Sequence, residues 1–336
     1  AIGASQGYIY IDAEFQNSIA IVKRAIAEAE EMGFLGTQIR GSAFSFELKL
    51  FLSMGAYICG EETALMNSIE GKRAVPRNKP PYPTDCGLFE KPTVVNNVET
   101  LANIPPILLN GPEWYRCLGV KGSHGTKLFS VSGNVNRPGV YEIELGRFTL
   151  GELIEGLAGG ITGQKRVKAI LPGGVSTSFL TERHLDTTLD YQSIQRAGSS
   201  LGTGGMLVFD EDQSIPTIVE RVFDFFRRES CGFCVPCRLG TNAVHNILRL
   251  LTEPIAQNQA GNHGDDECPD EAWHLDQLEN IASAMKLLSR CGLGQTACDS
   301  LLSALTYFED EFVAVAKSRQ REYELLHDPF AQIPAQ

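Results

Sequence analysis

The sequence lacks the features of several large protein classes. No uninterrupted apolar run approaches the ~18 residues that a membrane helix requires. The first residues carry no basic segment followed by an apolar stretch, as a secretory signal would. Basic residues are scattered and the formal net charge is −12, whereas nucleic-acid binding needs a basic surface. We therefore expect a cytoplasmic protein with no nucleic-acid partner and no direct membrane insertion.

Common nucleotide and metal motifs are also missing. No G-x-G-x-x-G follows a predicted strand, the GTGG at 202–205 is too short, and no Walker A sequence occurs. The six histidines form no metal-spaced pair on a predicted helix, and His245 and His274 are more typical of solvated or capping residues. The pattern gives no support to a conventional Rossmann dinucleotide site.

Hydrophobic periodicity divides the 336 residues into three regions. Residues 1–123 show strand patterns at 8–12 and 44–52, each followed by a turn or a helical pattern, and a further strand-turn-helix pattern at 93–104. This alternation predicts an α/β domain with parallel strands.

Residues 124–212 read as short strands with turns, and Thr149 with Glu152 forms a capping box that opens a helix. They predict a small α+β domain. Residues 213–336 show four amphipathic helical patterns, with a polar, acidic stretch at 253–273 between the second and the third. They predict a four-helix bundle with one long loop.

Three of the nine cysteines form the strongest chemical signal. Cys231, Cys234 and Cys237 have C-x2-C-x2-C spacing, and Gly232 lets backbone N–H groups approach the sulfurs. This spacing favours a 4Fe-4S cluster. Zinc is the main alternative, although its ligands usually come in pairs, and inert thiols are a weaker one.

A cubane needs a fourth ligand from elsewhere in the chain. Cys268 lies in the acidic loop, Cys298 lies within the last predicted helix, and Cys291 lies at the corner between the last two helices. An up-down bundle returns that corner to the end where the triad lies. We therefore favour Cys291.

A second motif, GAYICGEETAL, is ambiguous on its own. Gly55 and Gly60 flank a strand-to-helix turn at which a planar ligand or phosphate can approach the backbone, and Glu61 with Glu62 opens the helix. The alternative is that the two glutamates only compensate the helix dipole.

Asn96, Asn97 and Tyr82 each have two interpretations as well. The paired carboxamides are either helix caps or groups that bind a flavin or a phosphate. Tyr82 is either a core residue or a stacking platform for a base.

Five segments together resemble a known family: GAYICGEETAL, EGKRAVPRNKPPYP, KPTVVNNVET, ESCGFCVPCRLG and CGLGQTA. In this order they resemble the NADH-oxidising flavoprotein subunit of respiratory complex I and its relatives in NAD-reducing hydrogenases and NAD-dependent formate dehydrogenases. The resemblance implies an FMN-binding α/β domain, a ubiquitin-like β-grasp (SLBB-like) domain and a helical bundle that carries the 4Fe-4S cluster. The family also has an N-terminal glycine-rich flavin loop, which this sequence lacks. We therefore expect the sequence to be N-terminally incomplete.

The resemblance assigns roles residue by residue. Residues implied to bind FMN or the nicotinamide are Tyr57, Gly60, Glu61, Glu62, Asn96 and Asn97, with Glu62 as the catalytic residue. Tyr82, usually Phe in the family, is implied to stack on the adenine of NADH. The implied cluster ligands are Cys231, Cys234, Cys237 and Cys291.

These assignments predict a diaphorase subunit that passes electrons between NAD(H), FMN and the cluster. Its partners are expected to be other iron-sulfur subunits. We favour an NAD-reducing hydrogenase as the parent complex over a formate dehydrogenase or complex I. The competing function is a flavin-less electron relay or structural subunit.

Overall fold

The computed structural model describes residues 2–253 and 271–327, so Cys268 and most of the predicted acidic loop lie outside the described residues. The chain forms two compact units, residues 1–95 and 96–336, and each is described by itself.

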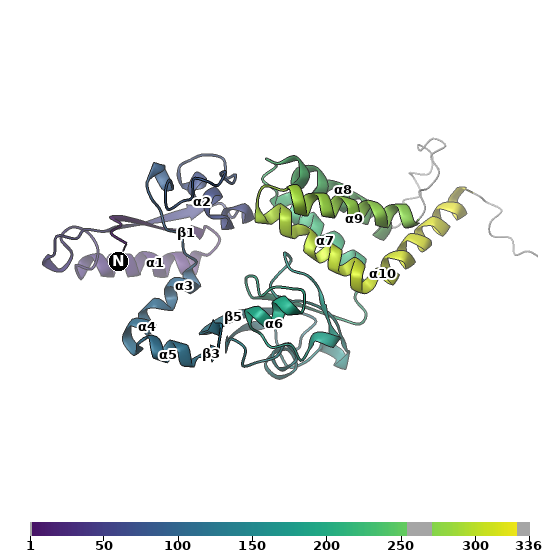
Figure 1. The fold of residues 1–336 in the computed structure, drawn as a ribbon, viewed down its shortest axis with the longest axis horizontal. Helices are drawn as coiled ribbons and strands as arrows, with labels where there is room; N and C mark the ends of the chain where they lie inside the picture. The colour runs from purple at the N-terminus through teal and green to yellow at the C-terminus, as the bar shows by residue number, and fades with distance from the viewer. Residues whose placement is uncertain (1, 254–270, 328–336) are drawn as a thin grey trace, which may run out of the picture. The chain divides into compact units, whose positions relative to one another are not determined.

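The first unit is built on a parallel strand pair. Strand β1 (Gln6–Asp12) pairs with β2 (Glu47–Ser53) in register from Gln6 opposite Glu47 to Asp12 opposite Ser53. Helix α1 (Gln16–Glu31) makes the crossover that parallel strands require and lies along the pair (Figure 1). The predicted β-α-β order is confirmed. The remaining elements of this unit are η1 (Ile39–Gly41), η2 (Tyr57–Gly60), α2 (Glu62–Ile69) and η3 (Leu88–Glu90).

The loop after α2 is fixed by one arginine. The backbone N–H of Arg77 donates to Thr63 Oγ1 at 2.8 Å, and its guanidinium Nε donates to Asn67 Oδ1 at 2.9 Å. The same guanidinium donates from Nη1 to the carbonyl of Gly87 at 2.9 Å and forms an ion pair with Glu70. Charge-assisted bonds from one side chain therefore hold residues 77–87 against α2.

The strand predicted at 93–95 does not form, and this part of the sequence interpretation is wrong. The N–H of Thr93 donates to the carbonyl of Pro83 at 2.8 Å, and its hydroxyl donates to the carbonyl of Lys91 at 2.8 Å. Val94 and Val95 stay exposed. Local turn bonds outweigh β propensity here, and no strand among the described residues pairs with this segment.

Short helices open the second unit: α3 (Val98–Ala102), α4 (Ile104–Asn110) and α5 (Pro112–Cys117). A five-stranded mixed sheet follows, with strand order β6-β5-β9-β7-β8, in which β5 and β9 are parallel and the other pairs antiparallel. Its strands are β5 (Thr126–Gly133), β6 (Gly139–Glu144), β7 (Val167–Leu171), β8 (Leu180–Thr181) and β9 (Gly205–Asp210).

The predicted capping box is confirmed in this region. The N–H of Thr149 donates to Glu152 Oε2 at 2.8 Å, and the N–H of Glu152 donates to Thr149 Oγ1 at 3.1 Å. The helix that it opens, η4 (Glu152–Leu157), is a π-helix. The smaller elements are the hairpin β3 (Gly119–Val120) and β4 (Ser123–His124), η5 (Thr162–Gln164), η6 (Glu182–His184) and α6 (Tyr191–Arg196).

Four helices complete the second unit: α7 (Ile215–Glu229), α8 (Val235–Thr252), α9 (Glu271–Leu288) and α10 (Gly292–His327). They pack around one apolar core, as the periodicity predicts, and that core continues into the sheet through Ala169, Leu171 and Phe179. Within the part of the chain that the structure describes, no helix is long and apolar enough to span a bilayer.

The buried carboxylate of Glu70 gives a stability prediction. Burial alone favours its neutral form, but bonds from Lys72 and Arg77 hold the pKa at about 2. Glu70→Gln should therefore cost roughly 1–2 kcal/mol of unfolding free energy at pH 7, after allowance for solvent screening. Because the folded-state pKa is depressed, this cost should be full above pH 4.5 and vanish as the pH falls towards 2.

Urea unfolding at several pH values measures the effect. Glu28→Gln, which breaks an exposed i,i+4 pair with Arg24, is the matched control and should change stability by less than about 0.5 kcal/mol. A Glu70→Gln cost that did not change with pH would contradict this account.

Candidate functional site

The triad cysteines and Cys291 meet at one end of the helical bundle. Cys234 immediately precedes α8, and Cys291 lies between the end of α9 and the start of α10. Figure 1 shows these three helix ends together. Burial, with smaller contributions from the nearby Cys234, Cys291 and Cys231, raises the pKa of the Cys237 thiol to about 11. The four thiols are therefore close enough to interact electrostatically.

Two of these thiols lie at helix N-termini. Cys234 is the N-cap residue of α8. The N–H groups of Leu293 and Gly294, in the first turn of α10, bond to the Cys291 thiol and lower its pKa, although burial is the larger effect and raises it. Unpaired N–H groups and the positive end of a helix dipole stabilise a thiolate. The site thus suits a group that carries negative charge.

The loop between the first two cysteines needs a glycine. Gly232 has φ +72°, a left-handed conformation that side chains disfavour. Its N–H donates to Ser230 Oγ at 3.2 Å, and Arg238 Nη1 donates to its carbonyl at 2.9 Å. Ser230 Oγ also lies 3.3 Å from Cys237 Sγ. Either atom can donate in this contact, and a deprotonated Cys237 sulfur would accept from the Ser230 hydroxyl.

Gly294 allows the first turn of α10 to approach the triad. A Cβ at this position would lie 2.5 Å from Ser289 Oγ and 2.9 Å from the Cβ of Cys237, closer than side-chain atoms pack. Gly292 has open space around its Cα. Of the two glycines in this corner, only Gly294 is required by packing.

Cys298, one alternative fourth ligand, belongs to the bundle core, although its thiol also lies close enough to Cys237 to interact with it electrostatically. Cys298 is fully buried in the bundle core, and its Sγ is 3.9 Å from the carbonyl oxygen of Gly294. Burial raises the pKa of this thiol to about 12, which favours the neutral form. Cys268 is outside the described residues.

The two glutamates of the first unit, Glu61 and Glu62, make different contacts. Glu61 Oε2 accepts from the N–H groups of Thr63 at 2.9 Å and Ala64 at 2.8 Å, so this side chain caps α2. A capping role for Glu61 was not among the two interpretations drawn from the sequence. Glu62 is partly exposed, and its ion pair with Lys79 lowers the pKa of its carboxyl group.

Lys79 is a site residue that sequence reasoning missed. Its ammonium contacts Glu62 and lies 3.0 Å from Glu61 Oε1, so it bridges the pair from a loop 17 residues away. The only signal was one lysine before the two prolines of KPPYP. Tyr82, three residues later, is 55% exposed and is not a core residue.

The turn before α2 leaves room for a ligand. Ile58 and Cys59 are buried, whereas Tyr57 is 41% exposed. A Cβ on Gly60 would meet nothing within 4 Å. A planar group therefore has access to the backbone at Gly60.

Asn96 and Asn97 fall in the second unit, and both are exposed. Asn97 Oδ1 accepts from the N–H of Glu99 at 2.8 Å, so the capping interpretation is correct for its oxygen. The Glu99 carboxylate in turn accepts from the N–H of Leu128 at 2.8 Å and from Lys127 Nζ at 3.0 Å. These bonds fix α3 to strand β5.

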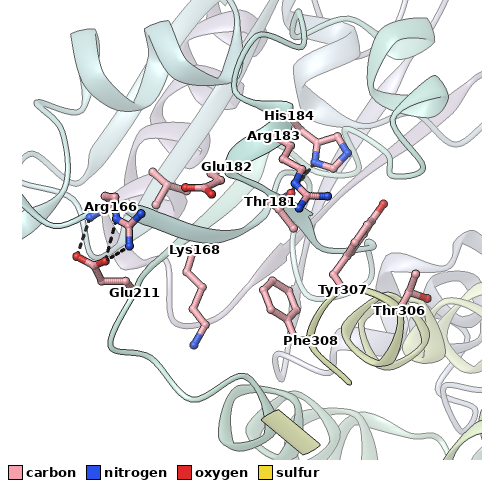
Figure 2. Close-up of a pocket in the computed structure, with 11 residues that line it drawn as sticks. Arg166, Lys168, Thr181, Glu182, Arg183, His184, Glu211, Thr306, Tyr307 and Phe308 are labelled. Atoms are coloured by element: carbon pink, nitrogen blue, oxygen red, sulfur yellow. Dashed lines mark hydrogen bonds and ion pairs between the residues drawn. The ribbon is translucent and has the colours of Figure 1, made fainter. Parts of the chain in front are cut away.

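A cleft of about 510 Å³ lies in the second unit, and no predicted site residue is among those that line it. Figure 2 shows it between β7, η6 and the stretch of α10 around Phe308. Its charged residues are largely paired: Arg166 with Glu211, and Lys168 with Glu311. His184 and Tyr307 form an edge-on ring contact at 5.8 Å.

Three known families match successive parts of the chain. Residues 1–106 match the Nuo51 FMN-binding domain, residues 127–199 match the SLBB domain, and residues 217–315 match the NADH-ubiquinone oxidoreductase-F iron-sulfur binding region. The FMN and 4Fe-4S regions expected from the sequence are therefore both present.

Proteins that align with almost the whole chain are subunits of NADH- or NADP-linked oxidoreductases. The chain is 42% identical to the F 2 subunit of NADH-quinone oxidoreductase of Rhizobium meliloti (strain 1021), over 95% of this chain and 72% of that protein. It is 44% identical to the F subunit of NADH-quinone oxidoreductase of Escherichia coli (strain K12), over 94% and 68%. The HndC subunit of NADP-reducing hydrogenase of Solidesulfovibrio fructosivorans is 41% identical, over 94% and 61%.

A solved structure is similar along almost the whole chain. It is a chain of an NAD+-reducing [NiFe]-hydrogenase in the H2-reduced state, with a TM-score of 0.78 and 30% identity. The match covers 98% of this chain and 55% of the hydrogenase chain. This chain thus spans just over half the length of that neighbour.

The fourth cluster ligand is tested by paired substitutions. Cys291→Ala should leave a three-iron or iron-free protein, because Cys291 faces the triad. Cys298→Ala, the matched control, should keep four irons, because its thiol faces the core. Iron and sulfide content with low-temperature EPR measure both. Four irons in Cys291→Ala, together with their loss in Cys298→Ala, would reverse the assignment.

Proposed function

This chain belongs to the family of NADH-quinone oxidoreductase F subunits, and from that premise we propose that it is a diaphorase subunit passing electrons between NAD(H), FMN and a 4Fe-4S cluster. The observation that carries the proposal is the meeting of four cysteines at two helix N-termini in the iron-sulfur region of the chain. The flavin supplies the exchange between a two-electron hydride donor and a one-electron acceptor.

The donor set at the bundle end fits a cubane better than a single ion. Among residues 2–253 and 271–327, no three His, Cys, Asp or Glu side chains converge tightly enough to surround one metal ion. A cubane is larger, and each thiolate binds a different iron. We therefore propose Cys231, Cys234, Cys237 and Cys291 as its ligands. Reduced thiols of this kind favour a cytoplasmic location.

In the first unit, we propose that Glu62 acts at the nicotinamide, with Tyr57 and Gly60 beside the flavin. The ion pair with Lys79 keeps Glu62 ionised and fixes its orientation. Glu61 holds the turn rigid by capping α2 and contacting Lys79, so its contribution to the flavin site is positional. These residues bind and orient, and none has to act as a nucleophile.

We propose separately that Asn97 donates to FMN through its amide group. Its oxygen is already occupied as the cap of α3, which leaves the NH2 group as the side of the amide that can face a ligand acceptor. Asn96, its exposed neighbour, is proposed to bind FMN as well. Tyr82 offers an exposed ring for stacking on the adenine.

The parent assembly and domain limits follow as finer proposals. The domains are proposed at 1–123, 124–212 and 213–336. We place the chain in an NAD-reducing hydrogenase, supported by the structural likeness to that enzyme. The relatives of similar identity also include complex I-type subunits, so that counterpart is the second candidate.

Analysis of the purified complex tests the function directly. We expect one FMN, iron and sulfide in cubane ratio, and NADH-dependent reduction of an artificial acceptor. Hydrogen-dependent NAD+ reduction would identify the hydrogenase, and NADH-dependent quinone reduction would identify the complex I counterpart. Protein with a cluster but no flavin would instead indicate an electron relay.

Tyr82→Ala tests whether this ring stacks on the adenine of NADH. Loss of the stacking surface should raise the KM for NADH about 5- to 30-fold, because base stacking on an aromatic ring is worth roughly 1–2 kcal/mol, with little change in kcat. Tyr82→Phe should be nearly normal. Tyr191→Ala, which removes a similarly exposed tyrosine from α6, is the matched control. An unchanged KM in Tyr82→Ala would remove the adenine assignment.

A further inference from the structure

Two neighbouring polar groups at the cysteine corner are buried without a hydrogen-bond partner. Among the described residues, four side-chain nitrogen or oxygen atoms are buried with no hydrogen bond, on Arg77, His245, Ser289 and Arg290. Arg77 and His245 lie within ion-pair distance of glutamates, at 2.8 and 3.1 Å. Ser289 Oγ and Arg290 Nε have no such ion-pair contact, although the Arg290 guanidinium lies over the Phe233 ring at 4.4 Å, so Ser289 Oγ is the atom without a partner.

A buried hydroxyl without a partner costs free energy, about 1–3 kcal/mol, so it usually marks a missing ligand, ion or water. Ser289 is only 5% exposed. A Cβ on Gly294 would lie 2.5 Å from Ser289 Oγ, so the hydroxyl faces the first turn of α10 at the cysteine corner. A ligand bound at that corner would be within reach as its partner.

The geometry points to the cluster. The space that a Gly294 Cβ would fill lies 2.5 Å from Ser289 Oγ and 2.9 Å from Cys237 Cβ, so the hydroxyl and this cysteine are near neighbours. Ser230 Oγ approaches the same sulfur, at 3.3 Å. Cys237 is thus associated with one hydroxyl on its own loop and a second from the α9–α10 corner.

We propose that the Ser289 hydroxyl donates a hydrogen bond to a cluster sulfur on the Cys237 side and, together with Ser230, raises the reduction potential of the cluster. This rests on the cluster assignment in the proposed function. A hydrogen-bond donor stabilises the sulfur more in the reduced cluster, which carries one more negative charge, so the reduced state is favoured. Ser289 is a tuning residue, and it is not a ligand.

Ser289→Ala in the intact complex is the test. EPR-monitored redox titration of the cluster should show a lower midpoint potential, with the one-electron equilibrium constant changed up to about tenfold, or ~59 mV. Ser230→Ala should shift it in the same direction. Ser289→Thr, which keeps the hydroxyl, should have a midpoint potential close to that of the wild type.

Ser300→Ala is the matched control. It removes another fully buried hydroxyl, one whose acceptor is the carbonyl of Ala297 within α10, and should leave the potential unchanged. Pulsed EPR after exchange into D2O gives an independent readout, because one exchangeable proton coupling should disappear in Ser289→Ala and remain in Ser300→Ala.

The outcomes separate the two proposals. An unchanged potential and unchanged proton couplings in a Ser289→Ala protein with four irons would overturn the tuning role and leave the diaphorase assignment standing. Absence of any cluster in the wild-type complex would overturn the proposed function itself. If Ser289→Ala does not assemble, Ser289→Gly is a second variant that removes the same donor together with the β-carbon, and a wild-type potential in that variant would overturn the inference.

Discussion

The candidate cluster site depends on how closely α8 packs against α9. Gly240, on α8, faces Met285 on α9, and a Cβ there would lie 2.3 Å from the Met285 sulfur. Because the helices meet at this glycine, α9 ends beside the start of α8 and brings the Ser289–Cys291 corner to the triad. Without this contact, four cysteines from two distant segments have no reason to meet.

The electrostatics of that corner follow from the same packing. Burying several thiols favours their neutral forms, as the raised pKa values of Cys237 and Cys291 indicate. The first turn of α10 opposes this at Cys291, where the N–H groups of Gly294 and Leu293 lower the thiol pKa. Burial outweighs the lowering effect of Lys286 at Cys298, in the core, and its pKa is raised to about 12. The position of a cysteine along its helix therefore distinguishes a candidate ligand from a cysteine that only packs in the core. The residue type alone does not.

Most elements of the fold could be predicted from periodicity, because amphipathic faces and caps are local signals. The Thr149–Glu152 box and the four helical patterns are examples. The failed strand at 93–95 shows the limit, because its β-branched residues are held by turn bonds to Pro83 and Lys91 that no window of sequence reveals. The roles of Lys79 and Arg77 were missed for a related reason. Their partners on α2 are 10 to 18 residues away, and only the folded loop brings them together.

The two asparagines show why competing sequence interpretations need not exclude each other. An asparagine has both an acceptor and a donor on one planar group, so capping a helix occupies the oxygen and leaves the NH2 group available. An aspartate would cap α3 equally well but offer no donor to a ligand. The helix that Asn97 caps is itself fixed to β5 by Glu99, whose ion pair with the buried Lys127 is not easily broken by solvent. The five-stranded sheet therefore has a physical role in the proposed flavin site, because strand β5 holds the helix that Asn97 caps.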